Sequence, residues 1–511
     1  MFRLLTSQLC TMVPLMPNEG SRRCRHSRWV GFAAVLVLSA GLVSPAFGAS
    51  DNEVEVRLKT PLTSYSTKAG TPFECVVLRP WVADNVVVIP QGATVHGHVG
   101  SVTSVGLGLR HESAKMELIF DDFVTADGLS FPLHAKLASI DNARERVKSG
   151  IVHGVIAANQ PNQVYFGLWH SPSLNLVGRS LIGLTGLSHQ INSGLGLGPA
   201  GAGGLLVLRL ALFRFPEPEI QYAPGADLSL IVNPALQTGV REVPETVLSA
   251  PDGVSEWLRK EPFGVDRRDN RPVGDIVNVA FLGSRLQLEN AFAAAGWAPA
   301  DPPTGKKKRQ AYYAFNAMRA YANAPVSALF YKGMLPEIVF EKSLNTVTKR
   351  HHIRVWYAGV VDGHELWLGA ATHDTGGTFN WHYFRFTHKI DPNVDGERDK
   401  IVTDLRFAGC ADPEMRVDRP TAASNGLDRA NNSYTDGAAT VLSLTDCQPS
   451  ETTPFVFRKP GNPVSRLARR MILEARNHVE RENFYYWTFQ AIMHAHDHVA
   501  QSSNQPGKPV N

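Results

Sequence analysis

The sequence predicts an α+β multidomain protein, in which an all-β barrel or sandwich is followed by an α+β domain and a C-terminal helical extension. Short runs of alternating apolar and polar residues, separated by turn residues, occupy residues 52–140, which is typical of an all-β domain. Apolar strands and capped helical segments alternate over residues 274–448. Residues 461–501 have the pattern of one long helix or two, basic at first and aromatic later.

Composition places the chain among globular proteins. Of its 511 residues, 43% are hydrophobic and 19% are charged, which argues against overall disorder. This length suggests about three domain-sized units. The net charge of +4 is small for such a chain. We therefore expect no nucleic-acid partner, because binding one requires a concentrated basic face.

The N-terminus has the order of a secretory signal peptide over residues 1–48. A stretch with four arginines precedes the uncharged apolar run GFAAVLVLSAGLV, and the small residues Ala46 and Gly48 stand just before the expected cut. The apolar run is short for a membrane-spanning helix. We expect export to the periplasm or cell envelope, with an uncleaved membrane anchor as the alternative. Met12 and Met16 are alternative start sites.

Cysteine usage after removal of the signal peptide favours one disulfide. Cys75, Cys410 and Cys447 remain in the mature chain, and an odd number in an oxidising compartment permits at most one internal pair and leaves one thiol. Cys410 and Cys447 flank one loop-rich stretch, so we predict that they pair. Cys75 lies in an apolar run, where we expect a buried and inert thiol.

The first domain, residues 52–140, is expected to be a small β-barrel or sandwich. Strands are expected, in chain order, at residues 54–58, 72–78, 86–89, 93–99, 115–120 and 131–137. Turn residues such as Pro90 and Gly92 separate these runs. Many short strands with turns between them pack as a barrel or as two facing sheets.

Part of this domain resembles the small β-domain of TrbI/VirB10-type proteins of conjugation systems. The segments TPLTSYSTKAGTPFECVVLRP and VVVIPQGATVHGHVGSV carry that family's extended opening and its hairpin. The resemblance extends over residues 54–140. It implies an envelope β-module that packs against or binds other components, and it brings no catalytic residue to this chain.

Two connecting segments are expected between the domains. Residues 141–235 form a Gly/Leu-rich connection with a closing strand near residues 228–232. Its apolar part is too short to cross a bilayer, so a loosely ordered insert and a membrane-contact segment both remain open. Residues 236–273 are charged and contain prolines, and we expect a linker with one short helix at residues 254–259.

Residues 274–448 are expected to form the α+β domain. Strands are expected at residues 275–282, 352–356, 365–371, 381–386 and 441–444, and helices between residues 284 and 296, at 309–321 and at 397–407. Ser284 is the expected N-cap of the first helix, and Gly296 is its expected stop.

The densest group of ionisable residues lies between residues 351 and 399, and it brackets several strands and a helix start. His, Asp and Glu at such density suit a metal site or acid–base catalysis. The catalytic candidates are His351, His352, Arg354, His373, His388, Asp391, Asp395, Arg398 and Asp399. The candidate ligands of a divalent metal, the one cofactor considered, are His352, His373, His388, Asp391 and Asp395.

Structural capping is the competing interpretation of the same residues. The spacing matches no strong catalytic template, since the sequence contains neither HExxH nor CxxC. Asp395 and Glu397 stand where carboxylates cap a helix and complement its dipole, and Arg398 can pair with one of them. Both interpretations remain open at the level of the sequence.

The same stretch resembles the LssY C-terminal domain family over residues 274–448. Matching blocks occur in the family's order: GDIVNVAFLGSRLQLENAFAAAGW, VTKRHHIRVWY, ELWLGAATHD, THKIDPNVDGERDKIVTDLRFAG and SYTDG. The family's recurrent positions coincide with most of the catalytic candidates and include Trp356. In other envelope proteins this domain follows membrane-embedded PAP2-type lipid-phosphatase domains, and its own activity is undefined. No multi-spanning segment is recognisable in this sequence, so phosphatase activity is not carried over.

Two functional hypotheses follow. The first is a non-catalytic binding or assembly module of the cell envelope or of a secretion system, with an envelope protein or a membrane surface as its partner. The second is a metal-assisted phosphoester hydrolase that uses the five candidate metal ligands. The sequence leaves open whether the chain is an enzyme.

Overall fold

The computed structural model describes most of the chain after the N-terminal segment. The described residues are 52–108, 111–159, 215–266, 272–316, 318–380, 385–419, 433–449 and 455–481. The predicted signal peptide, most of the Gly/Leu-rich connection and the aromatic part of the C-terminal extension lie outside them. The described residues are predominantly β, with two large sheets.

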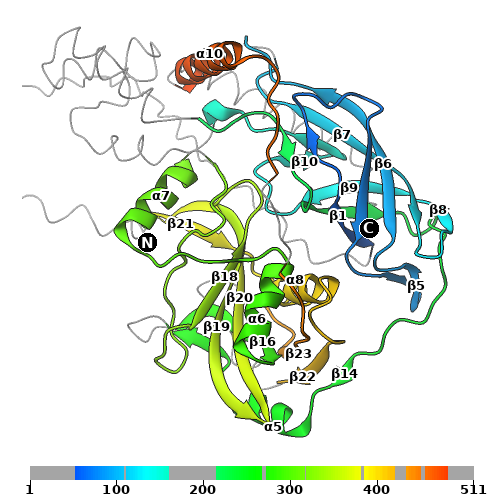
Figure 1. Cartoon of the computed structure of the whole chain (residues 1–511), viewed down its shortest axis with the longest axis vertical. Helices are drawn as coiled ribbons and strands as arrows, with labels where there is room; N and C mark the ends of the chain where they lie inside the picture. The colour runs from blue at the N-terminus through cyan, green and yellow to red at the C-terminus, as the bar shows by residue number, and fades with distance from the viewer. Residues whose placement is uncertain are drawn as a thin grey trace, which may run out of the picture. The chain divides into compact units, whose positions relative to one another are not determined.

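The first large sheet is barrel-like and has nine strands (Figure 1). Its strands are β1 (Glu53–Leu58), β3 (Pro72–Val77), β6 (Thr94–Thr103), β7 (Lys115–Val124), β8 (Ser130–Pro132), β9 (Ala135–Ile140), β10 (Arg146–Lys148), β11 (Ile151–His153) and β13 (Asp227–Val232). The order is β10-β11-β7-β6-β3-β1-β13-β9, with β8 beside β7. The strand β13 follows the long connection in sequence and pairs with both β1 and β9.

Shorter elements accompany this sheet. They are the pair β4 (Trp81–Ala83) and β5 (Val86–Ile89), the pair β2 (Leu62–Thr63) and β12 (Gln221–Tyr222), and the 3-10 turn η1 (Ala157–Asn159). Alternation along the strands explains the core, since Val54, Val56 and Leu58 of β1 are buried and the residues between them are not. Cys75 is buried in the same core, and burial raises the pKa of its thiol to about 12, which keeps it protonated and unreactive.

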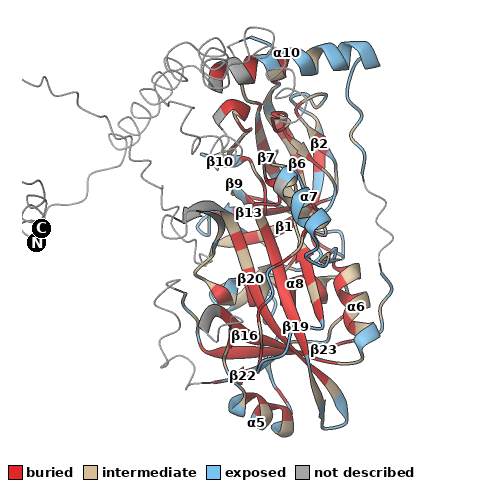
Figure 2. Ribbon diagram, turned by 90° about the vertical axis from the view of Figure 1, so that its left-hand side faces the viewer, coloured by how far each residue is buried: buried red, intermediate tan, exposed pale blue. Residues whose placement is uncertain are grey.

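The second large sheet has ten strands and is mixed. They are β14 (Leu248–Ser249), β15 (Gly264–Asp266), β16 (Pro272–Leu282), β17 (Ala298–Pro299), β18 (Ile338–Lys342), β19 (Lys349–Val361), β20 (His364–Asn380), β21 (Arg385–Ile390), β22 (Met415–Asp418) and β23 (Ala438–Ser443). The order is β14-β22-β23-β16-β20-β19-β18-β17, with β15 beside β16 and β21 beside β20. The central strands β16, β19, β20 and β23 are largely buried (Figure 2).

Helices are fewer than strands in the described residues. They are α5 (Asp252–Lys260), α6 (Arg285–Ala294), α7 (Gly305–Asn316), α8 (Val394–Phe407) and α10 (Pro463–Arg481). Leu288 and Phe292 of α6, with Ile401 and Leu405 of α8, share a hydrophobic core with one face of the second sheet. The α+β description therefore applies to this half, whereas the described chain as a whole is mainly β.

Local signals in the sequence account for the start of α6. Ser284 accepts a hydrogen bond from the backbone of Gln287, whose side chain binds back to the Ser284 N–H, so the predicted N-cap forms a capping box. Gly296 follows the helix with a φ of +81°, a conformation that glycine adopts readily. By contrast, α8 begins three residues earlier than expected, because Asn393 is its N-cap and accepts from the Gly396 N–H.

One disulfide and the character of the described helices complete the description of the fold. Cys410 and Cys447 form a disulfide, with their Cα atoms 5.4 Å apart. Among the described helices, none has both the length and the apolar character that a transmembrane span requires.

Candidate functional site

The hairpin of β19 and β20 positions four of the nine catalytic candidates, His351, His352, Arg354 and His373. The two strands are antiparallel, with His351 opposite His373 and Arg350 opposite Asp374. Successive side chains of a strand point to opposite faces, so His351 and His373 lie on one face while Arg350 and His352 lie on the other. The candidates therefore divide between two faces of one sheet.

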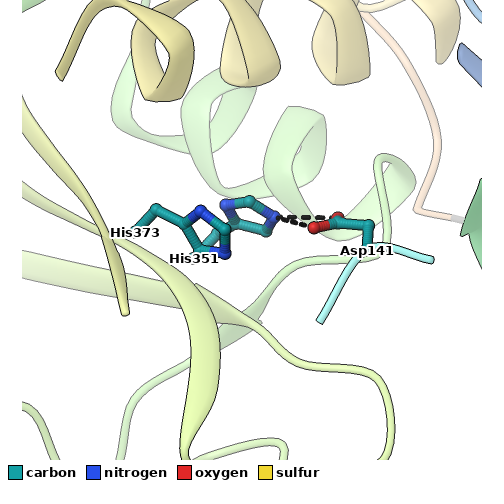
Figure 3. A group of neighbouring side chains, drawn as sticks. All are labelled: Asp141, His351 and His373. Atoms are coloured by element: carbon teal, nitrogen blue, oxygen red, sulfur yellow. Dashed lines mark hydrogen bonds and ion pairs between the residues drawn. The ribbon is translucent and has the colours of Figure 1, made fainter. Parts of the chain in front are cut away.

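His351 is held between two carboxylates, as Figure 3 shows for one of them. Its Nε2 contacts the Asp141 carboxylate at 2.8 and 3.0 Å. Its Nδ1 contacts Glu397 Oε2 at 2.5 Å. Asp141 directly follows β9 of the barrel-like sheet, whereas Glu397 lies in the first turn of α8. One imidazole thus joins three separate elements.

The two carboxylates decide the charge of this imidazole. Burial by itself lowers the pKa of His351, but the negative charges of Asp141 and Glu397 outweigh burial and raise the pKa to about 10. The same interaction holds the pKa of Asp141 well below its usual range, although burial alone would raise it. The His351 ring is therefore protonated at neutral pH and forms ion pairs with Asp141 and Glu397.

His373 lies beside His351 on the same face. The two rings stack with their centroids 4.3 Å apart. The His373 Nε2 is 3.0 Å from Asn142 Oδ1, and the His373 Nδ1 is 3.8 Å from Asp391 Oδ2. One ligand atom from each of Asp141, His351 and His373 lies within 4.8 Å of the other two. These three side chains, the His–Asp group, have the types and the proximity of metal ligands.

A network of buried charges adjoins the His–Asp group. Its members are Arg57, Asp227, Lys342, Lys400 and Asp404. Lys400 Nζ lies 2.6 Å from Asp227 of β13 and 3.1 Å from Asp404 of α8. Arg57 of β1 reaches the same two carboxylates at 2.7 and 2.9 Å. The network ties the barrel-like sheet to α8 and β18.

The opposite face of the hairpin holds a second buried cluster. Arg350 pairs with Glu341 at 2.7 Å and with Asp374 at 3.1 Å. Asp374 Oδ2 also lies 3.7 Å from His352 Nδ1 and 3.4 Å from His388 Nδ1. Burial lowers the pKa of both histidines, and that of His352 falls well below its usual value. Both rings are therefore neutral at neutral pH.

Some atoms of this second cluster have no hydrogen-bond partner in the part of the chain that the structure describes. They are His352 Nδ1, His388 Nδ1 and Glu341 Oε1. The two histidine nitrogens face the same oxygen of Asp374. With that carboxylate, however, they do not form a group of three ligand atoms that are all within 4.8 Å of one another. They therefore make a weaker cation site than the His–Asp group.

The remaining candidates have structural partners. Arg354 donates to Asp275 Oδ2 at 2.6 Å, and Thr372 donates to the same oxygen at 3.1 Å, which links β19, β16 and β20. Arg398 contacts Asp436 at 2.9 Å. The first pair joins neighbouring strands, and the second joins α8 to the segment that precedes β23.

The carboxylates at the start of α8 have structural partners. Asp395 accepts hydrogen bonds from the Thr435 hydroxyl at 2.8 Å and from the Asp436 N–H at 2.5 Å. Arg398 contacts Asp395 at 3.3 Å and Asp399 at 2.9 Å. This end of α8 is therefore fastened to the segment that precedes β23. Asp395, Arg398 and Asp399 act together there, away from the His–Asp group.

The five residues predicted as metal ligands do not share one centre. His373 and Asp391 lie near each other, His352 and His388 meet at Asp374, and Asp395 belongs to the start of α8. The candidates from the sequence did not include Asp141, which lies 210 positions before His351. Its place after a predicted strand carries no chemical signal. His351 was selected, but only as a catalytic candidate.

Comparisons with known proteins agree with part of the sequence interpretation. No curated protein matches the sequence. A solved structure, described as ComB10 of the Com type IV secretion system of Helicobacter pylori, is 11% identical, with 36% of this chain and 86% of that chain covered. The TM-score of 0.18 is too low for that likeness to carry an argument about fold or function.

A family model supports the assignment of the second half. The family described as LssY C-terminus matches residues 264–438. That range begins and ends ten residues before the range inferred from the sequence blocks, 274–448. It contains every candidate residue of the β19–β20 hairpin and of α8. The resemblance to the LssY C-terminus family is thus confirmed for residues 264–438 of this chain.

Proposed function

We propose that this chain is an exported, non-catalytic binding module of the cell envelope that attaches to an anionic membrane surface through α10. The observation that carries the proposal is the orientation of α10, which turns its apolar side outward. The proposal keeps the first of the two hypotheses from the sequence and specifies the surface and its partner.

The inner side of α10 is mostly polar. Arg469 contacts Glu219 at 2.6 Å, and Arg476 donates to the carbonyl oxygen of Gly106 at 2.7 Å. Among the α10 side chains that the structure describes, Leu473 is the apolar one that joins the core of the barrel-like sheet. The helix is thus attached by guanidinium groups that bind a carboxylate and backbone carbonyls.

The outer side of α10 carries an apolar stripe. Its exposed members are Val464, Leu467, Ala468, Met471, Ile472 and Ala475. They recur at spacings of three and four residues, which places them on one helix face. The exposed fraction is 75% for Val464 and 58% for Leu467. In Figure 2 the first turns of α10 are coloured as exposed.

This arrangement favours a membrane surface as the occupant of the stripe. A helix of a globular protein normally turns its apolar stripe to the core, so a contiguous exposed stripe marks a binding surface. Arg466 and Arg470 are also exposed next to it. Apolar residues flanked by arginines are the composition of helices that lie in the headgroup region of anionic bilayers.

Two further observations support an exported, non-catalytic protein. Several catalytic candidates are already engaged in ion pairs that hold the fold, with His351 between two carboxylates and Arg354 on Asp275. The Cys410–Cys447 disulfide suits an oxidising compartment, as the predicted signal peptide does.

Vesicle sedimentation tests the membrane proposal. The purified mature chain is mixed with vesicles of phosphatidylglycerol and phosphatidylcholine, and with vesicles of phosphatidylcholine alone. We expect binding to the anionic vesicles that weakens with added salt. Leu467→Glu/Met471→Glu should abolish it, because each change places a charge in the apolar stripe. Arg466→Gln/Arg470→Gln should weaken it roughly 30-fold, since each arginine contributes about 1 kcal/mol.

A matched control is available away from α10. Val360 is 62% exposed on β19, and Val360→Glu should leave vesicle binding unchanged. Equal binding by wild type and by the Leu467/Met471 variant would overturn the proposal. So would a dimer in solution that the same variant converts to a monomer without any vesicle binding, because the stripe would then join two copies of the chain.

The hydrolase alternative is tested with the same preparations. We expect no metal-dependent hydrolysis of p-nitrophenyl phosphate above the uncatalysed rate. Turnover that His373→Ala abolishes and that Val360→Glu leaves intact would replace the binding proposal with the hydrolase.

A further inference from the structure

We infer that Asp141, His351 and His373, with Asn142 as an additional oxygen donor, bind one zinc ion that clamps the barrel-like sheet to the second sheet. This inference is independent of the membrane proposal, because it concerns a different part of the molecule. It also differs from the ligand set expected from the sequence, of which it keeps only His373.

Both imidazoles turn the same nitrogen toward the same loop. His351 Nε2 lies 2.8 Å from Asp141 Oδ2, and His373 Nε2 lies 3.0 Å from Asn142 Oδ1. The two loop residues are adjacent, directly after β9. The mutually close atoms of Asp141, His351 and His373, with the Asn142 oxygen beside His373, offer four donors, and four is the number of ligands in a structural zinc site.

Each imidazole also has a carboxylate near its other ring nitrogen, Nδ1. Glu397 Oε2 lies 2.5 Å from His351 Nδ1, and Asp391 Oδ2 lies 3.8 Å from His373 Nδ1. Histidines that bind metals typically donate their other N–H to a carboxylate, which fixes the ring and increases its basicity. Here both rings have this partner on the side away from the loop, and the pairing of His373 is the looser one.

The charges of the surroundings favour a cation. The carboxylates of Asp141, Glu397 and Asp391 surround the two rings. Positive side chains also act on them: Lys400 Nζ lies 4.0 Å from Asp141 Oδ2, Lys349 interacts with the charge of Asp141, and Lys389 lowers the pKa of Asp391. Lys400 is shared with Asp227 and Asp404 of the adjoining network. The charge of a dication would thus be balanced by the Asp141 carboxylate and by the outer carboxylates of Glu397 and Asp391.

A modest movement would complete the coordination. Ligand atoms of a tetrahedral zinc site lie about 3.4 Å apart, because the bonds are about 2.1 Å long. In the His–Asp group the atoms lie within 4.8 Å of one another. The His351–Asp141 and His373–Asn142 contacts, at 2.8 and 3.0 Å, would open slightly, and the most distant pair, at no more than 4.8 Å, would close by up to about 1.4 Å.

The donor types select zinc over the alkaline-earth ions. Calcium takes six to eight oxygen ligands and magnesium takes an octahedron of oxygens, whereas imidazole suits zinc and its neighbours. Four protein donors would also leave no open position for a water, so a structural role follows rather than catalysis. The ligands come from β19, β20 and the loop after β9, so the ion would hold the two sheets together.

Elemental analysis and cobalt spectroscopy test the inference. The mature full chain is stripped with EDTA, dialysed against zinc and analysed for metal, and a second sample receives Co²⁺. We expect about one zinc per chain and the intense visible absorption of four-coordinate cobalt. His373→Ala and Asp141→Asn should each lower metal affinity at least tenfold and remove the thermal stabilisation that zinc gives to the wild type.

A surface histidine provides the control. His98 lies 2.8 Å from Asp121 in an exposed pair on β6 and β7, so His98→Ala removes a histidine–carboxylate pair without touching the His–Asp group. Zinc lost in His98→Ala but kept in His373→Ala would overturn the inference, as would wild type without zinc or visible cobalt bands. The cobalt spectrum needs no variant, so the test stands even if a substitution prevents folding.

Discussion

Glu341 of β18 has an unusual environment for a carboxylate. Its side chain is fully buried, and Arg350 donates to its Oε2 at 2.7 Å. Arg350 also binds Asp374 at 3.1 Å. Burial raises the pKa of Glu341 to about 8, and Arg350 lowers that pKa without cancelling the effect of burial. Glu341 is therefore largely protonated in the native state at neutral pH.

A stability prediction follows from the sign of this change. The pKa of Glu341 is higher in the folded chain than its ordinary value of 4.5, so the folded state binds the proton more tightly. Its contribution to stability is complete below about pH 4.5 and is lost as pH rises toward 8, at up to about 1.4 kcal/mol per pH unit. Glu341→Gln should flatten this part of the pH profile of unfolding free energy.

Urea unfolding between about pH 5 and pH 8 measures that profile. The exposed neighbour Glu337, whose side chain is 44% exposed, gives the matched control variant Glu337→Gln. That control should keep the wild-type slope. Parallel profiles for wild type and Glu341→Gln would contradict the prediction, because they would show that Glu341 does not change its protonation on folding.

At the residue scale, the sequence identified candidate residues of the site but not which of them lie together. The sequence placed His351, His352, His373 and Asp395 among the candidates, since their types suit chemistry. It could not tell which of them meet, because adjacent residues of a strand face opposite sides. His351 and His352 consequently belong to two different clusters, and Asp141 joins one of them from 210 positions away.

At the scale of single elements, the close packing of β6 against its neighbouring strands requires glycine at position 97. A Cβ on Gly97 would collide with the backbone oxygen of Ile119 on β7 and with the ring of Phe73 on β3. Gly97 pairs with Phe73 and Phe120 in the two neighbouring strands. Glycine therefore allows the neighbouring strands to approach closely at this point.

Gly97→Ala should therefore destabilise the barrel-like sheet. Overpacking of this kind costs about 1–3 kcal/mol, so we expect a lower thermal midpoint by calorimetry. Gly108→Ala is the control, because an added Cβ there meets nothing within 4 Å. An unchanged midpoint for Gly97→Ala would show that β6 shifts to accommodate a methyl group.

Elements differ in how well local sequence defines them. The start of α6 follows from Ser284 and Gln287, which form the capping box by local contacts. The strand β20 runs over His364–Asn380, far beyond the expected 365–371. Apart from Phe379, the added residues after Ala371 are polar or small, and they lack the apolar alternation from which a strand is recognised. They are strand because β19 and β21 pair with them.

At the scale of the whole molecule, buried charges hold the two sheets together. Asp404 of α8 contacts Lys342, Lys400 and Arg57, and it also accepts from Trp297 Nε1 at 2.9 Å. Burial alone would raise the pKa of Asp404, but its cationic neighbours lower it to about 2. The carboxylate is therefore ionised throughout the neutral range.

Acid should weaken this connection in a defined range of pH. The pKa of Asp404 is lower in the folded chain than its ordinary value of 3.8, so its contribution is complete above about pH 4 and is lost as pH falls toward 2. Asp404→Asn should destabilise the chain by about 3–5 kcal/mol at neutral pH, because it leaves buried cations without a partner.

Urea unfolding at neutral and acid pH checks this expectation. Asp418 forms an exposed pair with Arg416, and its side chain is 76% exposed, so Asp418→Asn should change the free energy of unfolding by less than about 1 kcal/mol. A similarly small effect of Asp404→Asn would mean that the network does not hold the sheets together, and the zinc clamp would then be the main connection to examine.

The sequence by itself determined the local features of this protein. It determined the alternating strands of the first half, the cap of α6, the Cys410–Cys447 pair as the favoured disulfide and the resemblance to the LssY C-terminus family. The strands and the cap depend on neighbouring residues, the family resemblance on ordered sequence blocks, and the disulfide on the small number of cysteines in the mature chain. Tertiary structure alone decided that Asp141 meets His351 and that the apolar stripe of α10 faces outward. The physical reason is that strand pairing and helix docking join distant residues, and no local pattern encodes which face will meet which partner.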